Sequence, residues 1–403
     1  MDRDFLLKTK KARRLYEGYA KDLPIIDFHN HLSIRDIADN RMYENLTELW
    51  LESDPYKHRL MRISGVPEHY ISGDAEPFEK MEKFCSVFPY LAGTPVYDWS
   101  RMELYAIFGI KELPCKESAR QIYDSAGEML KNPEFSNNAI LGRFNIEYQS
   151  PVATLYEDIS AFKKTGISPS LRGDNLLSLG EPTDLKKHLD NFDSAGCRFA
   201  DHALDAGFFE FGNADRLVQL AFEYAKRGWT LLLHLGALRQ TSSRLARIAG
   251  PAGGYAAVGS GFPLEKLCTL LNRMEEAGAL PKTVLFPLNM NDQASLAALE
   301  GSFSEDGVAG KIQLGPAWWW CDHTFGIRNT LDCIASFGVV SQFIGMTTDS
   351  RSILSFIRHD YFRRLVCSWV AEQDWGLSIP QMGAIIQNIC YYNAKRRVED
   401  VQG

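Results

Sequence analysis

The feature that most constrains the fold is an alternation of short apolar segments and helical segments from residue 143 onward. Each apolar segment ends in polar residues and is followed by a stretch with the apolar spacing of a helix. Short strands separated by helical stretches of about 10–15 residues are typical of a parallel sheet. Besides a first strand at 25–28, we expect strands at 145–149, 168–171, 198–200, 230–233, 283–288, 311–314 and 343–347.

Eight such strands are the number that closes a parallel (β/α)8 barrel. The sequence therefore predicts an α/β fold of the TIM-barrel type. The alternative is an open doubly wound sheet, but no G-x-G-x-x-G motif follows any expected strand, so the commonest ligand of that fold loses support. The helices expected between the strands lie at 185–195, 215–227, 264–276, 293–299, 327–337 and 352–372, with a helical tail at 379–398.

The barrel pattern is interrupted after the first strand. From 33 to 142 the chain is rich in aromatic residues, has helical spacing and shows few strand signals, so it predicts a helical insertion that caps one end of the barrel. We therefore divide the chain into an N-terminal helix with the first strand (1–32), the cap (33–142), and the rest of the barrel with its C-terminal helices (143–403). A barrel with insertions can use 403 residues as one domain.

Composition excludes several classes of function. The net charge of −7 argues against a surface that follows nucleic-acid phosphates, and no apolar run is long enough to span a membrane. The charged start of the chain argues against a signal peptide. The eight cysteines are scattered without a C-x-x-C pair, which fits reduced thiols in the cytoplasm better than a disulfide framework.

Polar residues gather at the expected ends of the strands, where a barrel of this kind carries its chemistry. His29 and His31 are two positions apart, so they share one face of the first strand. His234 ends the apolar run 231–233, and Asp349 follows the last strand. Each has a structural alternative: a buried hydrogen-bonded imidazole, or a helix N-cap for the aspartate. Together, three histidines and one aspartate suit a divalent cation.

A second group at the strand ends is basic. Arg172, Arg239 and Arg351 follow three different strands of an acidic chain, and Asp201 ends another strand. Any single arginine could form an ordinary surface salt bridge. Three at one mouth indicate bidentate capture of an anion, and the lack of a glycine-rich phosphate loop favours a carboxylate.

The residues at these positions also resemble a known family. The motif Asp27-Phe-His-Asn-His-Leu and the block Phe343-Ile-Gly-Met-Thr-Thr-Asp-Ser-Arg, which continues to residue 364, are similar to those of uronate (glucuronate) isomerases in the amidohydrolase superfamily. The resemblance covers nearly the whole chain. It also includes residues 5–7, 12–16, 46–51, 54–62, 197–205, 234–239, 280–285 and 318–319.

The resemblance implies a metal-dependent barrel enzyme that interconverts D-glucuronate with D-fructuronate and D-galacturonate with D-tagaturonate through a cis-enediol. The implied cofactor is a divalent metal, with zinc as the expected ion. By motif, the metal ligands are His29, His31 and Asp349, with His234 near or on the metal. The positions implied in substrate binding or proton transfer are Tyr56, Arg172, Asp201, Arg239 and Arg351. The proton shuttle is either Tyr56 or a metal-bound water held by Asp349.

The chain departs from the family pattern at three places near the expected pocket. Pro55 replaces a histidine, the run from Gln149 replaces a more polar one, and the loop around Ala256 lacks the usual aspartates. Two other functions stay open: a metal-dependent hydrolase on the same barrel, and a silent sugar-acid binding protein. The expected partner is a small hexuronate, with a homo-oligomer left open and no nucleic-acid or membrane partner.

Overall fold

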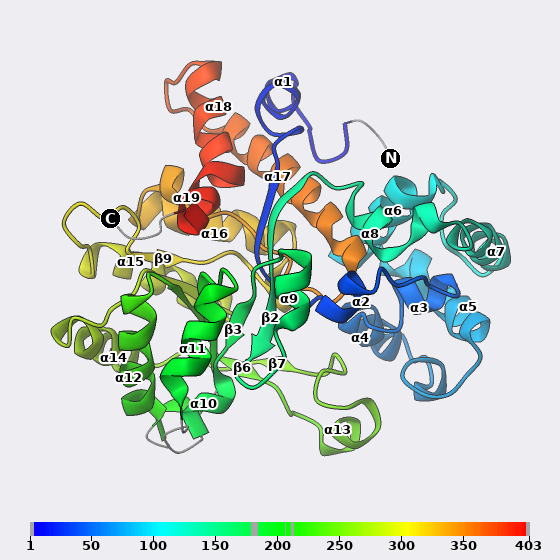
Figure 1. Cartoon of the computed structure of the whole chain (residues 1–403). Coiled ribbons are helices and arrows are strands. Elements are labelled where there is room, and N and C mark those ends of the chain that lie inside the picture. Colours follow the sequence, from blue (N-terminus) through cyan, green and yellow to red (C-terminus); the bar gives the residue numbers. More distant parts are fainter. Residues whose placement is uncertain (1–3, 179–183, 206, 211–212, 400–403) are drawn as a thin grey trace.

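Seven parallel strands form one continuous sheet at the centre of the molecule (Figure 1). The computed structural model describes residues 4–178, 184–205, 207–210 and 213–399. The strands are hydrogen-bonded in the order β1-β2-β3-β4-β5-β8-β9. Every neighbouring pair in this sheet except β5 and β8 is also consecutive in the numbering of the strands. Their bounds are β1 (Ile25–Asn30), β2 (Ile146–Thr154), β3 (Ser170–Arg172), β4 (Phe199–Leu204), β5 (Thr230–Leu235), β8 (Thr283–Pro287) and β9 (Ile312–Leu314).

Helices surround these strands, as the alternating pattern predicted. Helix α14 shows why: its buried residues Leu267, Leu270, Leu271 and Met274 recur at the spacing of one helix face, which packs inward. The helices from β2 onward are α9 (Ser160–Thr165), α10 (Asp174–Ser178), α11 (Leu185–Ser194), α12 (Asn213–Lys226), α13 (Ser243–Ala249), α14 (Leu264–Glu276), α15 (Gln293–Ser302), α16 (Thr324–Phe337), α17 (Arg358–Glu372), α18 (Ile379–Gln387) and α19 (Asn393–Glu399).

The segment expected to be the eighth strand, 343–347, does not form one, so that part of the prediction is wrong. The segment still lies against β1, because Asp349 N–H donates to the His29 carbonyl at 3.1 Å and His31 N–H to the Ser350 carbonyl at 2.9 Å. The His29 N–H is taken by the Thr347 hydroxyl at 2.9 Å. A side chain thus replaces a backbone carbonyl in the ladder, and the position of the eighth strand is filled by an irregular segment.

Two further differences concern the strands. The residues from Gln149 to Ala153, expected to follow the second strand, lie inside β2, which runs on to Thr154. A short antiparallel ribbon, β6 (Ala237–Leu238) with β7 (Ala257–Val258), follows β5 and was not predicted. Two-residue strands leave no periodic pattern that a sequence reading could detect.

Between β1 and β2 the structure has the helices of the expected cap. They gather on one side of the strands, in blue to cyan in Figure 1. The longer ones are α4 (Pro55–Ile63), α5 (Pro77–Val87), α6 (Pro95–Phe108) and α7 (Ala119–Leu130), and the short ones are α2 (Ile34–Ala38), α3 (Leu46–Trp50) and α8 (Asn137–Leu141). The boundaries at residues 32 and 142 stay a prediction.

A buried ion cluster holds the cap together. The Lys57 ammonium, on α4, donates to Asp54 Oδ2 at 2.6 Å and to Glu103 Oε2 at 3.2 Å, and all three side chains are buried. The same ammonium lies 5.0 Å from the centre of the Trp50 ring. Asp54 also caps α4, because it accepts from the N–H groups of Tyr56 and Lys57. The cluster therefore fixes the start of α4, which carries Tyr56.

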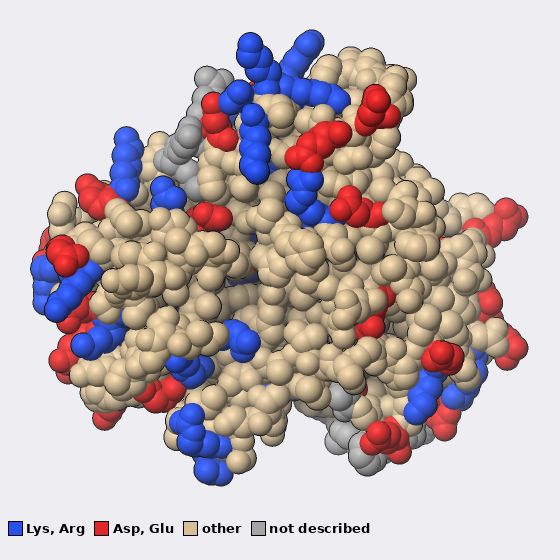
Figure 2. Space-filling view, turned by 180° about the vertical axis from the view of Figure 1, so that it is seen from behind, with Lys and Arg blue, Asp and Glu red and all other residues tan. Residues whose placement is uncertain are grey.

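The side chains packed between the strands are apolar, whereas the surface of the molecule carries both positive and negative charges. Phe28, Phe199 and Phe286 from three strands are fully buried and pack ring against ring. On the face shown in Figure 2, basic and acidic side chains are intermixed around the rim, and the centre is largely uncharged. Among the described residues, no helix has the length and apolar character needed to cross a membrane.

Candidate active site

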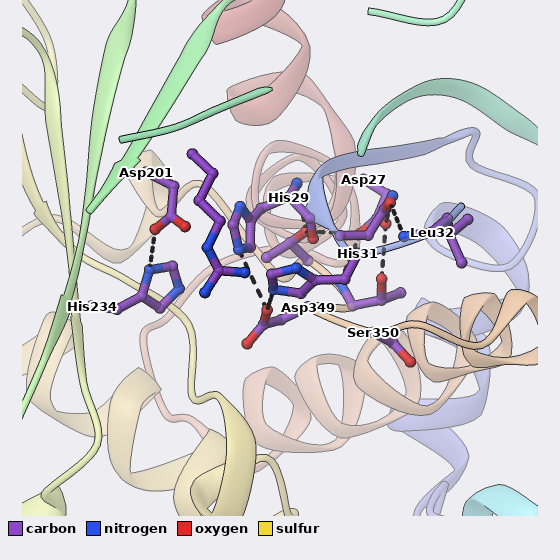
Figure 3. Close-up of polar contacts among 12 residues, drawn as sticks. Asp27, His29, His31, Leu32, Asp201, His234, Asp349 and Ser350 are labelled. Carbon is purple, nitrogen blue, oxygen red and sulfur yellow. Dashed lines mark hydrogen bonds and ion pairs between the residues drawn. The ribbon is translucent and has the colours of Figure 1, made fainter. Parts of the chain in front are cut away.

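His29, His31 and Asp349 come together at the junction between β1 and the segment that replaces the eighth strand (Figure 3). Asp349 Oδ1 lies 3.3 Å from His29 Nε2 and 3.0 Å from His31 Nε2. The His29 side chain is 1% exposed, that of Asp349 8% and that of His31 19%. The sequence prediction that these three residues share one site is consistent with this geometry, and the group opens to solvent on the side of His31.

The electrostatics of this group favour an ionised aspartate. Burial acts to raise the pKa of Asp349, but hydrogen bonds from His29 and His31 hold it well below its usual range. For His29, burial acts to lower the pKa, but the charges of Asp201 and Asp349 raise it. For His31, burial dominates and lowers the pKa. A carboxylate thus faces two imidazoles in a partly dry pocket, and a cation placed among them would be well compensated.

His234 forms a second pair with Asp201. The His234 Nδ1 atom lies 2.6 Å from Asp201 Oδ1, and both side chains are buried. Burial acts to raise the pKa of Asp201, but His234 and then His29 lower it far below its usual value. Because the carboxylate accepts from Nδ1, the lone pair of a neutral His234 is on Nε2, which is buried and has no hydrogen-bond partner among the described residues.

The two groups share His29. Its ring centre lies 5.0 Å from that of His234, and His29, Asp201 and His234 form a second cluster with ligand atoms in mutual reach. The His234 ring is fixed by stacking on Phe286 at 4.5 Å and by an edge contact with Trp318 at 4.6 Å. His234 is therefore held in place so that its Nε2 lone pair can serve as a ligand or as a proton acceptor next to the three-residue group.

Arg172 and Arg351 lie beside this group. Arg172 is the last residue of β3 and is 3.3 Å from Asp174. Its charge acts on His29, His31 and Asp201. Burial lowers the pKa of Arg351, and the charge of Arg172 adds to this shift. Both guanidinium groups thus place positive charge beside the three-residue group, where it would favour an anion.

Arg239 is held differently from the other two arginines. Its Nε atom donates to Asp205 Oδ2 at 2.7 Å, and its guanidinium lies 5.1 Å from the centre of the Trp319 ring. The structure thus gives this residue a carboxylate partner of its own. His202, next to Asp201 in sequence, is directed away from the site, because its Nε2 lies 3.0 Å from the hydroxyl of Tyr224 on α12.

Tyr56 enters the site from the cap. Its ring lies between the rings of Trp99 and Trp320, at centre distances of 5.7 and 5.4 Å, and the Arg358 guanidinium lies 4.9 Å from its centre. The hydroxyl is buried without a hydrogen-bond partner among the described residues. Burial raises the pKa of this hydroxyl far above its usual value, although Arg358 opposes the shift. Tyr56 is therefore a neutral phenol near neutral pH.

Two of the three departures from the family pattern, Pro55 and the loop around Ala256, lie near Tyr56. Pro55 is the first residue of α4, and its carbonyl oxygen would be 2.3 Å from a Cβ at Gly254, so only glycine fits there. The carbonyl of Ala256, in the same loop, accepts from the Trp320 indole N–H at 2.9 Å. These two departures therefore pack together and support the aromatic wall around Tyr56.

Arg358 was missed by the sequence analysis. It is buried on the first turn of α17 and donates to Asp322 Oδ2 and to the Thr348 carbonyl, both at 3.2 Å. Burial raises the pKa of Asp322 to about 6 despite this partner. Arg358 lies inside the block 343–364 that carried the family resemblance, which is the only signal that could have pointed to it.

Comparisons with known proteins match this site and fold. The family model of glucuronate isomerase matches residues 1–183 and 210–397. The chain belongs to the uronate isomerase family. The uronate isomerase of Caldicellulosiruptor bescii is 36% identical over 457 aligned positions that cover 98% of each chain, and that of Geobacillus thermodenitrificans is 36% identical over 458 positions with the same coverage. Because this chain has 403 residues, these uronate isomerases carry insertions relative to it.

Solved structures of uronate isomerases have the same fold. The uronate isomerase of Thermotoga maritima has a TM-score of 0.87 at 26% identity, with 98% of this chain and 99% of the other covered. The glucuronate isomerase of Caulobacter crescentus has a TM-score of 0.91 at 21% identity, with 100% and 98% covered, and supports the fold alone. The expectation of a barrel-type uronate isomerase is confirmed.

Proposed function

We propose that this protein is a uronate isomerase that interconverts D-glucuronate with D-fructuronate and D-galacturonate with D-tagaturonate. The observation that carries the proposal is the group of His29, His31 and Asp349 with two arginines beside it, in a chain of this family. The imidazoles and carboxylate suit the reacting end of a sugar acid, and the guanidinium groups suit its carboxylate. We place the protein in the cytoplasm, because its eight cysteines are free.

The donor set fits a divalent metal, and we propose zinc. His29, His31 and Asp349 would hold the ion, with His234 as a fourth candidate whose Nε2 has no other partner among the described residues. Two or three imidazoles and one carboxylate are ligands that zinc accepts. When bound, the ion supplies a Lewis acid for the oxygens at C1 and C2 of the sugar.

The reaction moves one proton from C2 to C1 through a cis-enediol, while the hydroxyl proton on O2 is lost and O1 gains one. Tyr56 is a neutral phenol, so it carries a proton to donate and is not available as a base, although its raised pKa makes it a weak acid. Asp349 is ionised and can hold a water that accepts the proton. We therefore assign Tyr56 to the donating side and Asp349, through its water, to the accepting side.

The arginines would hold the far end of the substrate. The charges of Arg172 and Arg351 act on each other beside the site, so together they would attract and hold one carboxylate. Arg239 already pairs with Asp205, so it would contact the sugar only in exchange for that partner. Asp201 would act on the substrate through His234, to which it is bound. The aromatic wall of Tyr56, Trp99 and Trp320 would exclude water from the reacting carbons.

The test is direct turnover. Protein saturated with zinc is incubated with D-glucuronate or D-galacturonate in deuterated water, and the products are followed by NMR. We expect the ketouronate to form, with deuterium from solvent at C1 where the transferred proton exchanges. Hydrolysis of a lactone or amide without isomerisation would favour the hydrolase, and binding of either sugar without any product would favour the silent binding protein.

A further inference from the structure

A buried carboxylate outside the site joins the two segments that carry the metal-site residues. Asp27, on β1, is 0% exposed. Its side chain joins β1 to the segment 347–350 (Figure 3). Its oxygens are contacted by Asn30 Nδ2 at 2.8 Å, Thr347 Oγ1 at 2.8 Å, Thr348 N at 2.6 Å, Thr348 Oγ1 at 2.8 Å and His359 Nε2 at 3.4 Å.

The N–H, hydroxyl and carbonyl of Thr348 are all hydrogen-bonded. Its N–H donates to Asp27 Oδ1 and its hydroxyl to Asp27 Oδ2, so one threonine engages both carboxylate oxygens. Its carbonyl accepts from Arg358 Nη1 at 3.2 Å. Thr348 is 3% exposed, so no water competes for these groups. The backbone just before Asp349 is therefore fixed by a carboxylate and a guanidinium.

The residue that follows needs such support. Asp349 has a φ of +45°, in the left-handed region that residues with a Cβ rarely adopt. Its N–H donates to the His29 carbonyl, and this conformation turns its carboxylate toward both imidazoles. An unfavourable backbone conformation persists only where the surrounding contacts hold it, and such residues cluster at functional sites.

We propose that Asp27 and Thr348 are positioning residues that hold Asp349 in this conformation and so preorganise the His29–His31–Asp349 group for its metal. They would not touch the ion or the substrate. The inference rests on the proposed function, because its measure is metal binding. If the contact were only a structural link between two segments, its loss would lower stability and leave the metal affinity of the folded protein unchanged.

The test compares two substitutions at one position. Thr348→Val keeps the shape, the N–H and the carbonyl but removes the hydroxyl bond to Asp27, whereas Thr348→Ser keeps the hydroxyl. Zinc affinity is measured by competition with a chromophoric chelator, and Co²⁺ is added as a spectroscopic probe of ligand geometry. We expect T348V to bind zinc about 10–100-fold more weakly, with an altered Co²⁺ visible spectrum, and T348S to bind like the parent.

A matched control distinguishes an effect on the metal site from an effect on the stability of the whole protein. Thr330, on α16, is also buried, and its hydroxyl donates to the Gly326 carbonyl within the helix at 3.0 Å. Thr330→Val should lower the melting temperature of the metal-free protein and leave zinc affinity unchanged. If T348V does not fold, Asp27→Asn takes its place, because it keeps the shape and removes the charge.

The outcomes are distinct. A parent protein that binds no zinc and turns over no uronate would overturn the proposed function. A parent that binds zinc, with T348V equal to it in zinc affinity and Co²⁺ spectrum, would overturn the positioning role alone. An effect of T348V that T348S shares would also overturn it, because the hydroxyl would then not be the cause.

Discussion

Replacing Asp201 by asparagine should change the proton position on His234 without moving its ring. Asp201 Oδ1 accepts from His234 Nδ1 at 2.6 Å, and both side chains are buried. The ring is also fixed by Phe286 and Trp318, at centre distances of 4.5 and 4.6 Å, and these contacts are untouched. Asparagine has the shape of aspartate, so the substitution creates no cavity and changes only charge and hydrogen bonding.

The size of the effect follows from this bond. An asparagine amide can donate to Nδ1, which moves the imidazole proton to Nε2, the buried atom that faces the site. A protonated Nε2 has no lone pair for a metal. Loss of a partner that orients a metal-ligating histidine costs about 10–100-fold in metal affinity or activity. At about 1.4 kcal/mol for each factor of ten, this corresponds to about 1.4–2.8 kcal/mol.

The assay has two readouts. We would measure kcat/KM for isomerisation of D-glucuronate and zinc affinity by chelator competition, and expect both to fall by about 10–100-fold in D201N. The control is Asp190→Asn, since Asp190 is 55% exposed on α11 and pairs with Arg227 at 2.5 Å. A D201N protein with both values near those of the parent and of D190N would refute the assignment of Asp201 as the partner that orients His234.

Three other substitutions probe the site and its support. Asp349→Asn removes the carboxylate and should lower kcat/KM by at least about 100-fold, measured by NMR of the product. Lys57→Met leaves two buried carboxylates without their cation and should lower the free energy of unfolding, measured with urea, by about 3–5 kcal/mol. The control Lys131→Met, whose side chain is 70% exposed, should lower it by less than about 1 kcal/mol. Burial raises the pKa of Glu300 to about 7, so its ionised form is disfavoured in the folded state and the free energy of unfolding should fall as pH rises from about 4.5 through 7, by up to about 3 kcal/mol. Glu300→Gln should reduce this pH dependence, and equal slopes in the two proteins would contradict the assignment.

The fold was largely predictable because its signal is local and repeated. Each strand and helix carries its own apolar spacing, so α14 (264–276) was predicted with its observed bounds. The prediction of an eighth strand was wrong because the contact of this segment with β1 depends on the Thr347 side chain, which no spacing rule describes. The ribbon β6–β7 was not predicted because its strands are too short to show an alternating pattern.

The candidate site was predictable where its residues follow strands. His29, His31 and Asp349 were expected to meet because parallel strands bring their carboxyl ends to one edge. The partners of these residues were not predictable in the same way. That Asp201 binds His234, and that Arg239 pairs with Asp205, depends on side-chain directions across neighbouring strands. Arg358 comes from a helix face, where a buried guanidinium has no sequence signature of its own.

The contact between β1 and the 347–350 segment also bears on how the protein is made. The hydrogen bond from His29 N–H to Thr347 joins residues 318 positions apart, so it forms only after nearly all of the chain has been synthesised. Contacts of such long range are slow to form, because the intervening chain must be ordered or closed first. A chain that ended before residue 347 would contain both histidines without their aspartate. The complete set of His29, His31 and Asp349 is therefore assembled only after this long-range contact can form.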